Sequence, residues 1–312
     1  MRGSEDGSTS LADDAAAVIA RRRHYAEFFG DAVPPAGYGV VVGNCQAESI
    51  RLVVSSGDHP AVRIPAVHEM DAADAERLHR LLAGAAFLIV QPIRDGYRGL
   101  PLGTGQLRQA LPSTARTVVV PSLRYGGLHP FQAAIRVPGV DEDPPLVAYH
   151  DVRLIAEAAG LPVAADLPPE VVRAVAEDSV SELRRREGLG VDIVASDLYA
   201  LVVADLARTV NHPGNAVFLP FGERVVAALG APGTAVDPGR PILAGVQAPL
   251  EPWVVDAWSL DAEPRRDWIV GGERVEAEVV AEAHRRWYAA HPGFVAAAVE
   301  RLAPLVRRWR AA

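Results

Sequence analysis

The stretch Val-Val-Val-Gly-Asn-Cys-Gln, residues 40 to 46, decides the fold that we expect for this chain. A β-branched run that ends in a glycine is typical of a buried strand followed by a tight turn. Cys45, the only cysteine in the chain, follows where a helix should begin. The field of a helix N-terminus stabilises a thiolate and lowers the pKa of a cysteine, which predicts a reactive side chain. A free cysteine is also often a small buried hydrophobic residue, so an inert Cys45 is the alternative.

Outward from this stretch, short apolar runs alternate with amphipathic segments. We expect strands at 38–42, 62–67, 86–91 and 117–120, and helices at 45–55, 72–82 and 104–111. This alternation predicts an α/β fold with a short parallel sheet that helices cover on both faces. Ligands of such sheets bind beyond the carboxyl ends of the strands. Those ends are Gly43 to Cys45, the segment around His68, Gln91-Pro92 and Pro121-Ser122.

The remainder of the chain is predicted to be largely helical. The expected helices lie at 13–29, 149–160, 168–187, 192–209, 220–229, 273–289 and 292–310. In the first of them, Val18 and Ile19 are expected on the apolar face and Arg21 on the solvated side. We expect a disordered tail at 1–12, an α/β catalytic core with a helical insertion at 13–230, and a final part at 231–312. That final part combines an irregular segment rich in Pro, Gly and Trp with closing helices packed on the core.

Composition excludes several classes of function. All 31 basic residues are arginines, so neither a Schiff-base lysine nor the lysine of a phosphate-binding P-loop is available. A net charge of −8 without any basic block argues against nucleic-acid binding. The N-terminal residues lack the basic and apolar regions of a signal peptide, and the apolar stretches are too short to cross a bilayer. Together with the single cysteine, these features predict a cytoplasmic protein without membrane insertion.

Gln91 and three of the nine histidines are the polar residues that could assist Cys45. Gln91 ends a strand predicted to lie beside the first, so it could complete an oxyanion site with the backbone N–H groups of residues 45 and 46. His129, His150 and His212 each lie at a break between elements. His212 is expected to close helix 192–209, whose C-terminal dipole would favour the imidazolium formed by a general base. A structural role is the alternative for each histidine.

Other sites are weaker predictions. His24, His79, His284 and His291 fall on expected exposed helix faces or ends, and we discount them. Zinc ligation by Cys45 and the three histidines is not expected, because their long spacings match no known ligand pattern.

Five short blocks resemble, in the same order, the WcbI family of capsular polysaccharide biosynthesis proteins. These blocks are Gly43-Asn44-Cys45-Gln46, Gln91-Pro92 with Tyr97, Gly127-Leu128-His129-Pro130, Tyr149-His150 and Asn211-His212-Pro213. The resemblance extends over residues 38 to 230 and implies a coenzyme A-dependent acyltransferase with an SGNH-like core. It implies Cys45 as the nucleophile and His212 and Gln91 as catalytic partners. The residues that it assigns to substrate or cofactor binding are Asn44, Gln46, Tyr97, His129, His150 and Asn211.

Two features of the resemblance stay open. Asp151 follows Tyr149-His150 where a small residue is expected, so it either joins the site or caps the following helix. Arg51, Arg94 and Arg98 lie near the expected strand ends and are candidates to bind the phosphates of coenzyme A.

The expected function is therefore transfer of an acyl group from coenzyme A or a carrier-protein thioester to a hydroxyl or amine of a sugar-like or natural-product acceptor. No metal is expected, and the expected partners are the acyl donor, the acceptor and a carrier protein. A thioesterase or esterase would use the same nucleophile. A non-catalytic ligand-binding scaffold with a buried Cys45 is the alternative from a different class. Covalent transfer and direct attack by the acceptor need nearly the same residues, so both are open.

Overall fold

The computed structural model describes residues 16–140 and 142–310. The chain divides into two compact units. The first unit contains the residues up to Ser122 together with Gly190–Ile193 and Phe221–Pro238. The second contains Leu123–Leu189, Val194–Pro220 and the residues from Gly239 onward. This division does not follow the expected boundary at residue 230, and the expected tail at 1–12 lies outside the described residues.

The first unit is built on a four-stranded parallel sheet. Its strands are β1 (Gly39–Val42), β2 (Ala61–Val62), β3 (Phe87–Val90) and β4 (Arg116–Val119), in the spatial order β2-β1-β3-β4. The predicted α/β class is confirmed. β2 is shorter than expected because Pro65 has no N–H to donate to a neighbouring strand. The chain leaves the sheet there and forms the short 3-10 helix η1 (Val67–Glu69), where the Val67 N–H donates to the Gly43 carbonyl.

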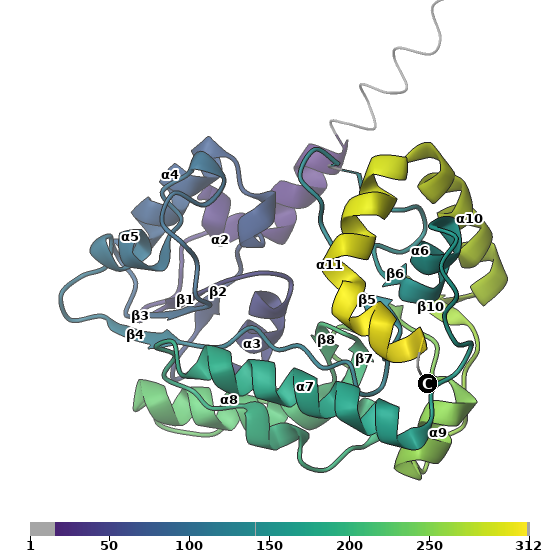
Figure 1. Cartoon of the computed structure of the whole chain (residues 1–312). Coiled ribbons are helices and arrows are strands. Elements are labelled where there is room, and N and C mark those ends of the chain that lie inside the picture. Colours follow the sequence, from purple (N-terminus) through teal and green to yellow (C-terminus); the bar gives the residue numbers. More distant parts are fainter. Residues whose placement is uncertain (1–15, 141, 311–312) are drawn as a thin grey trace, which may run out of the picture. The chain divides into compact units, whose positions relative to one another are not determined.

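Helices cover both faces of this sheet (Figure 1). α2 (Ala26–Phe29), α4 (Ala72–Leu82) and α5 (Thr104–Gln109) lie over one face, and α3 (Gln46–Val54) lies over the other. Val40, Val42, Leu88 and Val90 alternate along their strands, so they point to one face and form a core with α2, α4 and α5. The predicted helices at 45–55, 72–82 and 104–111 are therefore present.

The strand order places a topological switch point between β1 and β3. The chain passes from β1 through α3 to β2 on one side, and then crosses to β3 on the other side of β1. A crevice opens at the carboxyl ends of two strands whose connections leave in opposite directions. Gly43 follows β1 and Gln91 follows β3, so both lie at this point.

The start of the described chain is helical over residues 16–24, but its buried face is not the predicted one. Val18 and Ile19 are 59% and 53% exposed. Arg21 instead turns toward the molecule and donates at 2.7 Å to Asp74, a carboxylate that is 1% exposed. Arg77 pairs with the other oxygen of Asp74 at 2.9 Å, so Arg21 completes the pairing of a buried carboxylate, and this favours its orientation.

The second unit is mainly helical. It contains α6 (Val152–Ala158), α7 (Pro169–Glu187), α9 (Pro252–Trp258), α10 (Ala277–Ala290) and α11 (Pro292–Arg310). Three small antiparallel sheets accompany the helices. They are β5 (Gln132–Ala133) with β6 (His150–Asp151), β7 (Ala207–Thr209) with β8 (His212–Pro213), and β9 (Val246–Gln247) with β10 (Trp268–Val270) and β11 (Glu273–Val275). α8 (Asn215–Leu229) begins in this unit, and its residues from Phe221 onward belong to the first.

The predicted helix at 192–209 is wrong. The segment contains only the 3-10 helices η3 (Ser196–Tyr199) and η4 (Ala204–Leu206) before β7 begins. The Glu187 carboxylate accepts from the N–H groups of Ala195 and Ser196, at 2.7 and 2.8 Å. Side-chain acceptors of this kind compete with helical hydrogen bonds. The segment 230–272 is also less irregular than expected, since it contains β9, α9 and β10.

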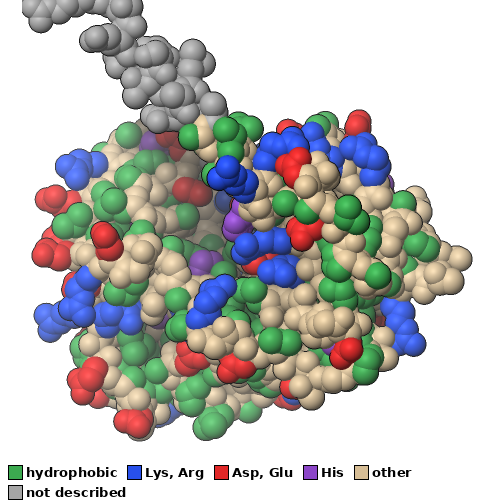
Figure 2. Space-filling view, turned by 180° about the vertical axis from the view of Figure 1, so that it is seen from behind, with side chains coloured by type: hydrophobic (Ala, Val, Ile, Leu, Met, Phe, Trp, Pro, Cys, Tyr) green, Lys and Arg blue, Asp and Glu red, His purple; other side chains and the backbone are tan. Residues whose placement is uncertain are grey.

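The face of the molecule in Figure 2 carries arginine and acidic side chains intermixed. Over the part of the chain that the structure describes, no helix is long and apolar enough to cross a membrane.

Candidate functional site

The turn between β1 and α3, Gly43 to Gln46, is held by a network of amide groups; we call it the Cys45 turn. The Asn44 N–H donates to Gln91 Oε1 at 2.8 Å, and Gln91 Nε2 donates to Gln46 Oε1 at 3.1 Å. The Gln46 N–H donates to Asn44 Oδ1 at 2.9 Å, and Asn44 Nδ2 donates to Ser122 Oγ at 3.1 Å. The ends of β1, β3 and β4 therefore meet here, as the strand-end argument predicted.

Gly43 is required by the close approach of Gln91. A Cβ added at residue 43 would overlap Gln91 Oε1 and lie 2.9 Å from Gln91 Cδ. Gln91 is buried and bonded on both sides, so it has little freedom to move away. A glycine after β1 thus lets one glutamine fix the orientation of the whole turn.

Cys45 is the N-cap residue of α3 and is partly exposed. Backbone N–H groups of Cys45 and Gln46 favour the thiolate, as the turn geometry predicted. Burial has the larger and opposite effect, and the Glu69 carboxylate adds to it, so the pKa of the Cys45 thiol is raised. The expectation of a lowered pKa is wrong, because it counted the helix N-terminus and not the desolvation of the thiol.

Cys45 lines a cavity of about 170 Å³ in the first unit. Four of the lining side chains carry polar or charged groups that the sequence analysis discounted or passed over: His24, Glu48, Arg63 and Glu69. Arg63 could have been found, because it directly follows the short strand β2 at the same edge of the sheet as Cys45. Arg63 pairs with Glu48 at 2.6 Å, so its positive charge in the cavity is held in place and balanced by a carboxylate.

The predicted phosphate-binding arginines differ in their surroundings. Arg51 donates to both oxygens of Glu48, at 2.7 and 2.9 Å, so its fork is already occupied by a carboxylate. Arg94 and Arg98 are exposed in the segment after β3. Tyr97 lies there too, half-buried against the core of the first unit, in the 3-10 helix η2 (Tyr97–Gly99).

Two of the three predicted oxyanion donors already have partners. The Gln46 N–H bonds to Asn44, and the Gln91 side chain bonds to Gln46. These bonds position the turn in its resting form. An oxyanion role for the two groups stays a prediction.

The predicted histidines belong to the second unit. His212 lies in β8, not at a helix end, so the dipole argument for its charge is wrong. Its Nε2 is 3.0 Å from the Tyr149 hydroxyl. Burial lowers the pKa of His212 to about 4 although a hydrogen bond with the Val246 backbone opposes this. Asn211 accepts at 3.3 Å from the Thr209 hydroxyl, within the same hairpin.

His129 and His150 are buried inside the second unit. The two ring nitrogens of His129 lie 3.1 Å from the carbonyl oxygens of Ala207 and Pro249, which indicates that the ring connects two segments of backbone. His150 Nδ1 is 2.8 Å from the Tyr288 hydroxyl, and its ring stacks on Phe294 at 4.6 Å. Burial lowers the pKa of each histidine to about 4.

His284 contradicts the expectation of an exposed helix face. It is 1% exposed, on the inner side of α10 near His150. The acidic and basic residues around it in the sequence suggested a solvated helix, and only the packing of α10 against α6 shows otherwise. The structure thus brings Cys45, Asn44, Gln46 and Gln91 together in one unit and Tyr149 with His212 in the other.

A family model described as the polysaccharide biosynthesis enzyme WcbI matches residues 38–234. A solved structure of WcbI matches with a TM-score of 0.73 and 22% identity, covering 88% of this chain and 97% of that chain. It is described as the native protein without a disulfide bond between coenzyme A and one of its cysteines. No curated protein matches. At this identity the structural match supports the fold.

Proposed function

The chain belongs to the WcbI family of polysaccharide biosynthesis enzymes, and we propose that it transfers an acyl group from a thioester donor to a sugar-like acceptor, using Cys45. The donor is coenzyme A or a carrier-protein thioester, and the acceptor group is a hydroxyl or an amine. The observation that carries the proposal is the place of Cys45, which lines a cavity beyond the carboxyl ends of β1 and β2 and has two backbone N–H groups stabilising its thiolate.

The solved WcbI structure adds support for coenzyme A. A disulfide between coenzyme A and a cysteine can form only where the thiol of the ligand reaches that cysteine. Cys45 is the only cysteine of this chain and falls within the residues that match the family. It is therefore the residue of this chain that we assign to the thiol end of coenzyme A.

The proposed reaction begins with a protonated Cys45 thiol, since burial raises its pKa. A base removes the proton as sulfur attacks the thioester carbonyl. The new carbon–sulfur bond replaces the bond to coenzyme A, whose thiolate leaves and takes up a proton. The acceptor then loses its proton, attacks the acyl-cysteine and releases Cys45. His212 remains the sequence-based choice of base; burial lowers its pKa to about 4, which keeps it neutral at pH 7 but makes it a weak base toward the thiol.

Intact-protein mass after brief incubation with acetyl-CoA tests the proposal. We expect the mass of one acyl group to be added to the wild-type chain and not to Cys45→Ala. Coenzyme A should raise the melting temperature of both proteins, which shows that the variant still folds and binds. A wild-type chain with neither an adduct nor a shift in melting temperature would contradict a coenzyme A donor.

The raised pKa of Cys45 favours one alternative, direct attack of the acceptor on a thioester bound beside an uncharged Cys45. That mechanism predicts no adduct, while coenzyme A still stabilises the chain and Cys45→Ser retains transfer activity. A thioesterase would instead form the adduct and release the acyl group to water at the same rate with or without an acceptor. A scaffold protein would show slow alkylation of native Cys45 and no turnover.

A further inference from the structure

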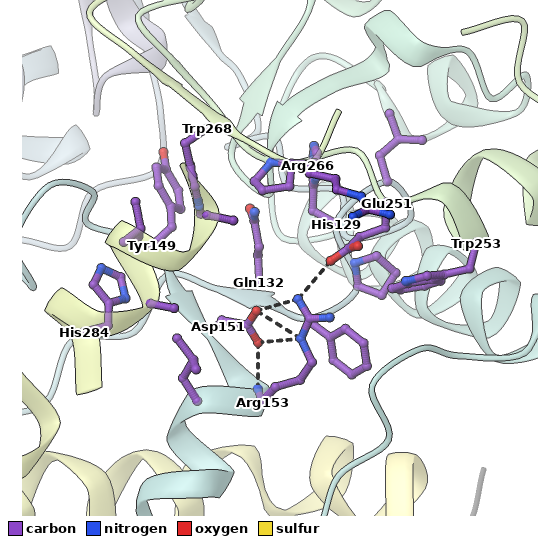
Figure 3. Close-up of a pocket in the computed structure, with 18 of the residues that line it drawn as sticks. His129, Gln132, Tyr149, Asp151, Arg153, Glu251, Trp253, Arg266, Trp268 and His284 are labelled. Carbon is purple, nitrogen blue, oxygen red and sulfur yellow. Dashed lines mark hydrogen bonds and ion pairs between the residues drawn. The ribbon is translucent and has the colours of Figure 1, made fainter. Parts of the chain in front are cut away.

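The second unit contains a cavity of about 330 Å³ (Figure 3). The lining residues His129 and Tyr149 belong to the blocks that resemble the WcbI family, and no ligand has been assigned to the cavity so far. It lies among β5, β6, α9, β10 and α10, and we call it the aromatic cavity. Its labelled lining residues are His129, Gln132, Tyr149, Asp151, Arg153, Glu251, Trp253, Arg266, Trp268 and His284. The volume is at the lower end of the range of small-molecule sites, about 300–1,000 Å³. We propose that the aromatic cavity binds a polyhydroxylated ring, a sugar or a cyclitol.

The pairing of β5 with β6 explains which side chains reach this cavity. Gln132 lies directly opposite Asp151, and Ala133 lies opposite His150. Cross-strand neighbours share one face of a sheet and successive residues alternate between faces. Gln132 and Asp151 therefore both point into the cavity, while His150 points away toward Tyr288. Asp151 also accepts from the Arg153 N–H at 2.8 Å, so it both caps α6 and lines the cavity.

An ion-pair network gives the cavity a fixed set of hydrogen-bond acceptors. Arg153 donates to Asp151 at 2.6 Å and to Glu251 at 3.0 Å, and its guanidinium lies 4.5 Å from the centre of the Phe131 ring. The side chains of Asp151 and Glu251 remain 24% and 29% exposed. A carboxylate has about four lone-pair sites. Both oxygens of Asp151 already accept two hydrogen bonds each from Arg153, whereas Glu251 accepts from Arg153 at one oxygen and can still accept from ligand hydroxyls. Arg153 and Arg266 balance the charges of the two carboxylates, so these four lining side chains carry no net positive charge that would favour a phosphate.

Gln132 provides the independent sign of a missing ligand. Its Oε1 is buried and has no hydrogen-bond partner among the residues that the structure describes. An unsatisfied buried acceptor costs about 1–3 kcal/mol, and such groups are rare in native proteins. In Figure 3 the Gln132 side chain points into the cavity between Trp268 and Arg266. This oxygen is scarcely accessible in the free protein, so a ligand hydroxyl would satisfy it after a small turn of the Gln132 side chain.

Aromatic rings supply the apolar side of the site. Trp268 stacks on Tyr149, with ring centres 6.3 Å apart and planes at 23°. Trp253 is half-buried and meets Phe131 edge-on, with ring centres 5.5 Å apart. The face of an aromatic ring is negative and attracts C–H groups. A ring with C–H groups on one face and hydroxyls around its edge matches both the aromatic and the acceptor side chains. A flat nucleobase would leave most of the acceptors unused.

The claim that this ligand is the acyl acceptor rests on the proposed function. The claim that the aromatic cavity binds such a ring does not. The test therefore uses no acyl donor. Wild type is titrated with methyl glycosides of neutral hexoses, a methyl N-acetylhexosaminide and myo-inositol, and binding is followed by ligand-observed NMR and tryptophan fluorescence. We expect at least one of these probes to bind. Gln132→Leu should lower its affinity by about tenfold, the loss of one well-placed hydrogen bond. The same variant should raise the melting temperature of the free protein, because the unsatisfied oxygen is gone.

Gln106→Leu is the matched control. Gln106 Oε1 accepts from the N–H groups of Gly96 and Gly103, both at 3.0 Å, so this variant should lower the melting temperature and leave probe affinity unchanged. The proposal is overturned if no probe binds wild type, or if Gln132→Leu binds the probes as wild type does. It is also overturned if Gln132→Leu weakens adenosine 3′,5′-bisphosphate and not the glycosides. Cys45→Ala should bind the probes normally, which separates this result from failure of the acyl-transfer proposal.

Discussion

The amide side chains of the Cys45 turn and of the aromatic cavity differ in how fully their hydrogen bonds are made. In the turn, Asn44, Gln46 and Gln91 bond to one another, and a single arrangement satisfies them. In the cavity, the acceptor oxygen of Gln132 is buried without a partner among the described residues. The first arrangement stabilises a fixed geometry in the free protein. The second lowers stability until a ligand arrives, so substitutions should affect folding at the turn and binding at the cavity.

The largest expected effect is that of Gly43→Ala. The added methyl group would overlap Gln91 Oε1 and displace a buried side chain that makes two hydrogen bonds. Overpacking and two lost bonds together predict a loss of about 3 kcal/mol in the free energy of unfolding. Denaturant unfolding measures this, and Gly57→Ala is the control, because nothing lies within 4 Å of an added Cβ there. Equal stability of the two variants would show that the turn tolerates another arrangement.

Acid should lower the stability of the second unit, because its buried histidines are held in the neutral form. Burial lowers the pKa of His150 to about 4, with a contribution from His284, against 6.5 for an unperturbed histidine. Between these values the unfolded chain binds the proton that the folded chain rejects, so stability is lost as pH falls. At pH 5 this costs about 2 kcal/mol for His150 alone.

His150→Phe tests this contribution, since Phe can stack on Phe294 and does not titrate. The variant should be less stable at pH 7, because the Tyr288 hydroxyl loses its partner. Its loss of stability between pH 7 and pH 5, measured by denaturant unfolding, should be about 2 kcal/mol smaller than that of wild type. Equal losses in the two proteins would mean that His150 is not held neutral by burial.

The sequence predicted the first unit better than the second for a physical reason. Strands 40–42 and 87–90 are continuous apolar runs, and a parallel sheet buries such runs on both faces, so pattern and structure agree. The same rule correctly placed Gln91 at the end of the strand beside β1, next to the Cys45 turn. In the second unit, the helix expected at 192–209 was lost near its start to the side chain of Glu187, which ends α7 and lies eight and nine residues before the N–H groups that it binds. Local patterns do not contain those contacts.

The candidate site shows the same limit. The position of Cys45 followed from the strand-to-helix pattern, whereas its pKa depends on burial and on Glu69, which only the folded structure reveals. Gln132 had no sequence signal, because a two-residue strand is too short to show alternation. The exposure of His284 was predicted wrongly, because the periodicity of a helix does not show how many of its faces pack against other helices.

The smallest expected effect concerns the charge of Glu69. It tests whether a residue of the Cys45 cavity changes the reactivity of the thiol while the hydrogen bonds of the turn stay as they are. Glu69 lies in η1 beside the Cys45 cavity, and its negative charge raises the pKa of the thiol. Glu69→Gln should therefore increase the rate of Cys45 alkylation by iodoacetamide at pH 7, with little effect on stability. Because Glu69 is half exposed, the interaction is worth about 0.5 kcal/mol, a factor of about two in rate.

Glu76→Gln is the matched control for that measurement, since Glu76 is 77% exposed on α4 and pairs with Arg80. It should leave the alkylation rate of Cys45 unchanged, and high salt should reduce the difference between Glu69→Gln and wild type. A large increase in rate with Glu69→Gln, accompanied by lower stability, would mean instead that Glu69 holds the cavity closed. In that case packing around the turn, and not the charge of Glu69, determines the alkylation rate of Cys45.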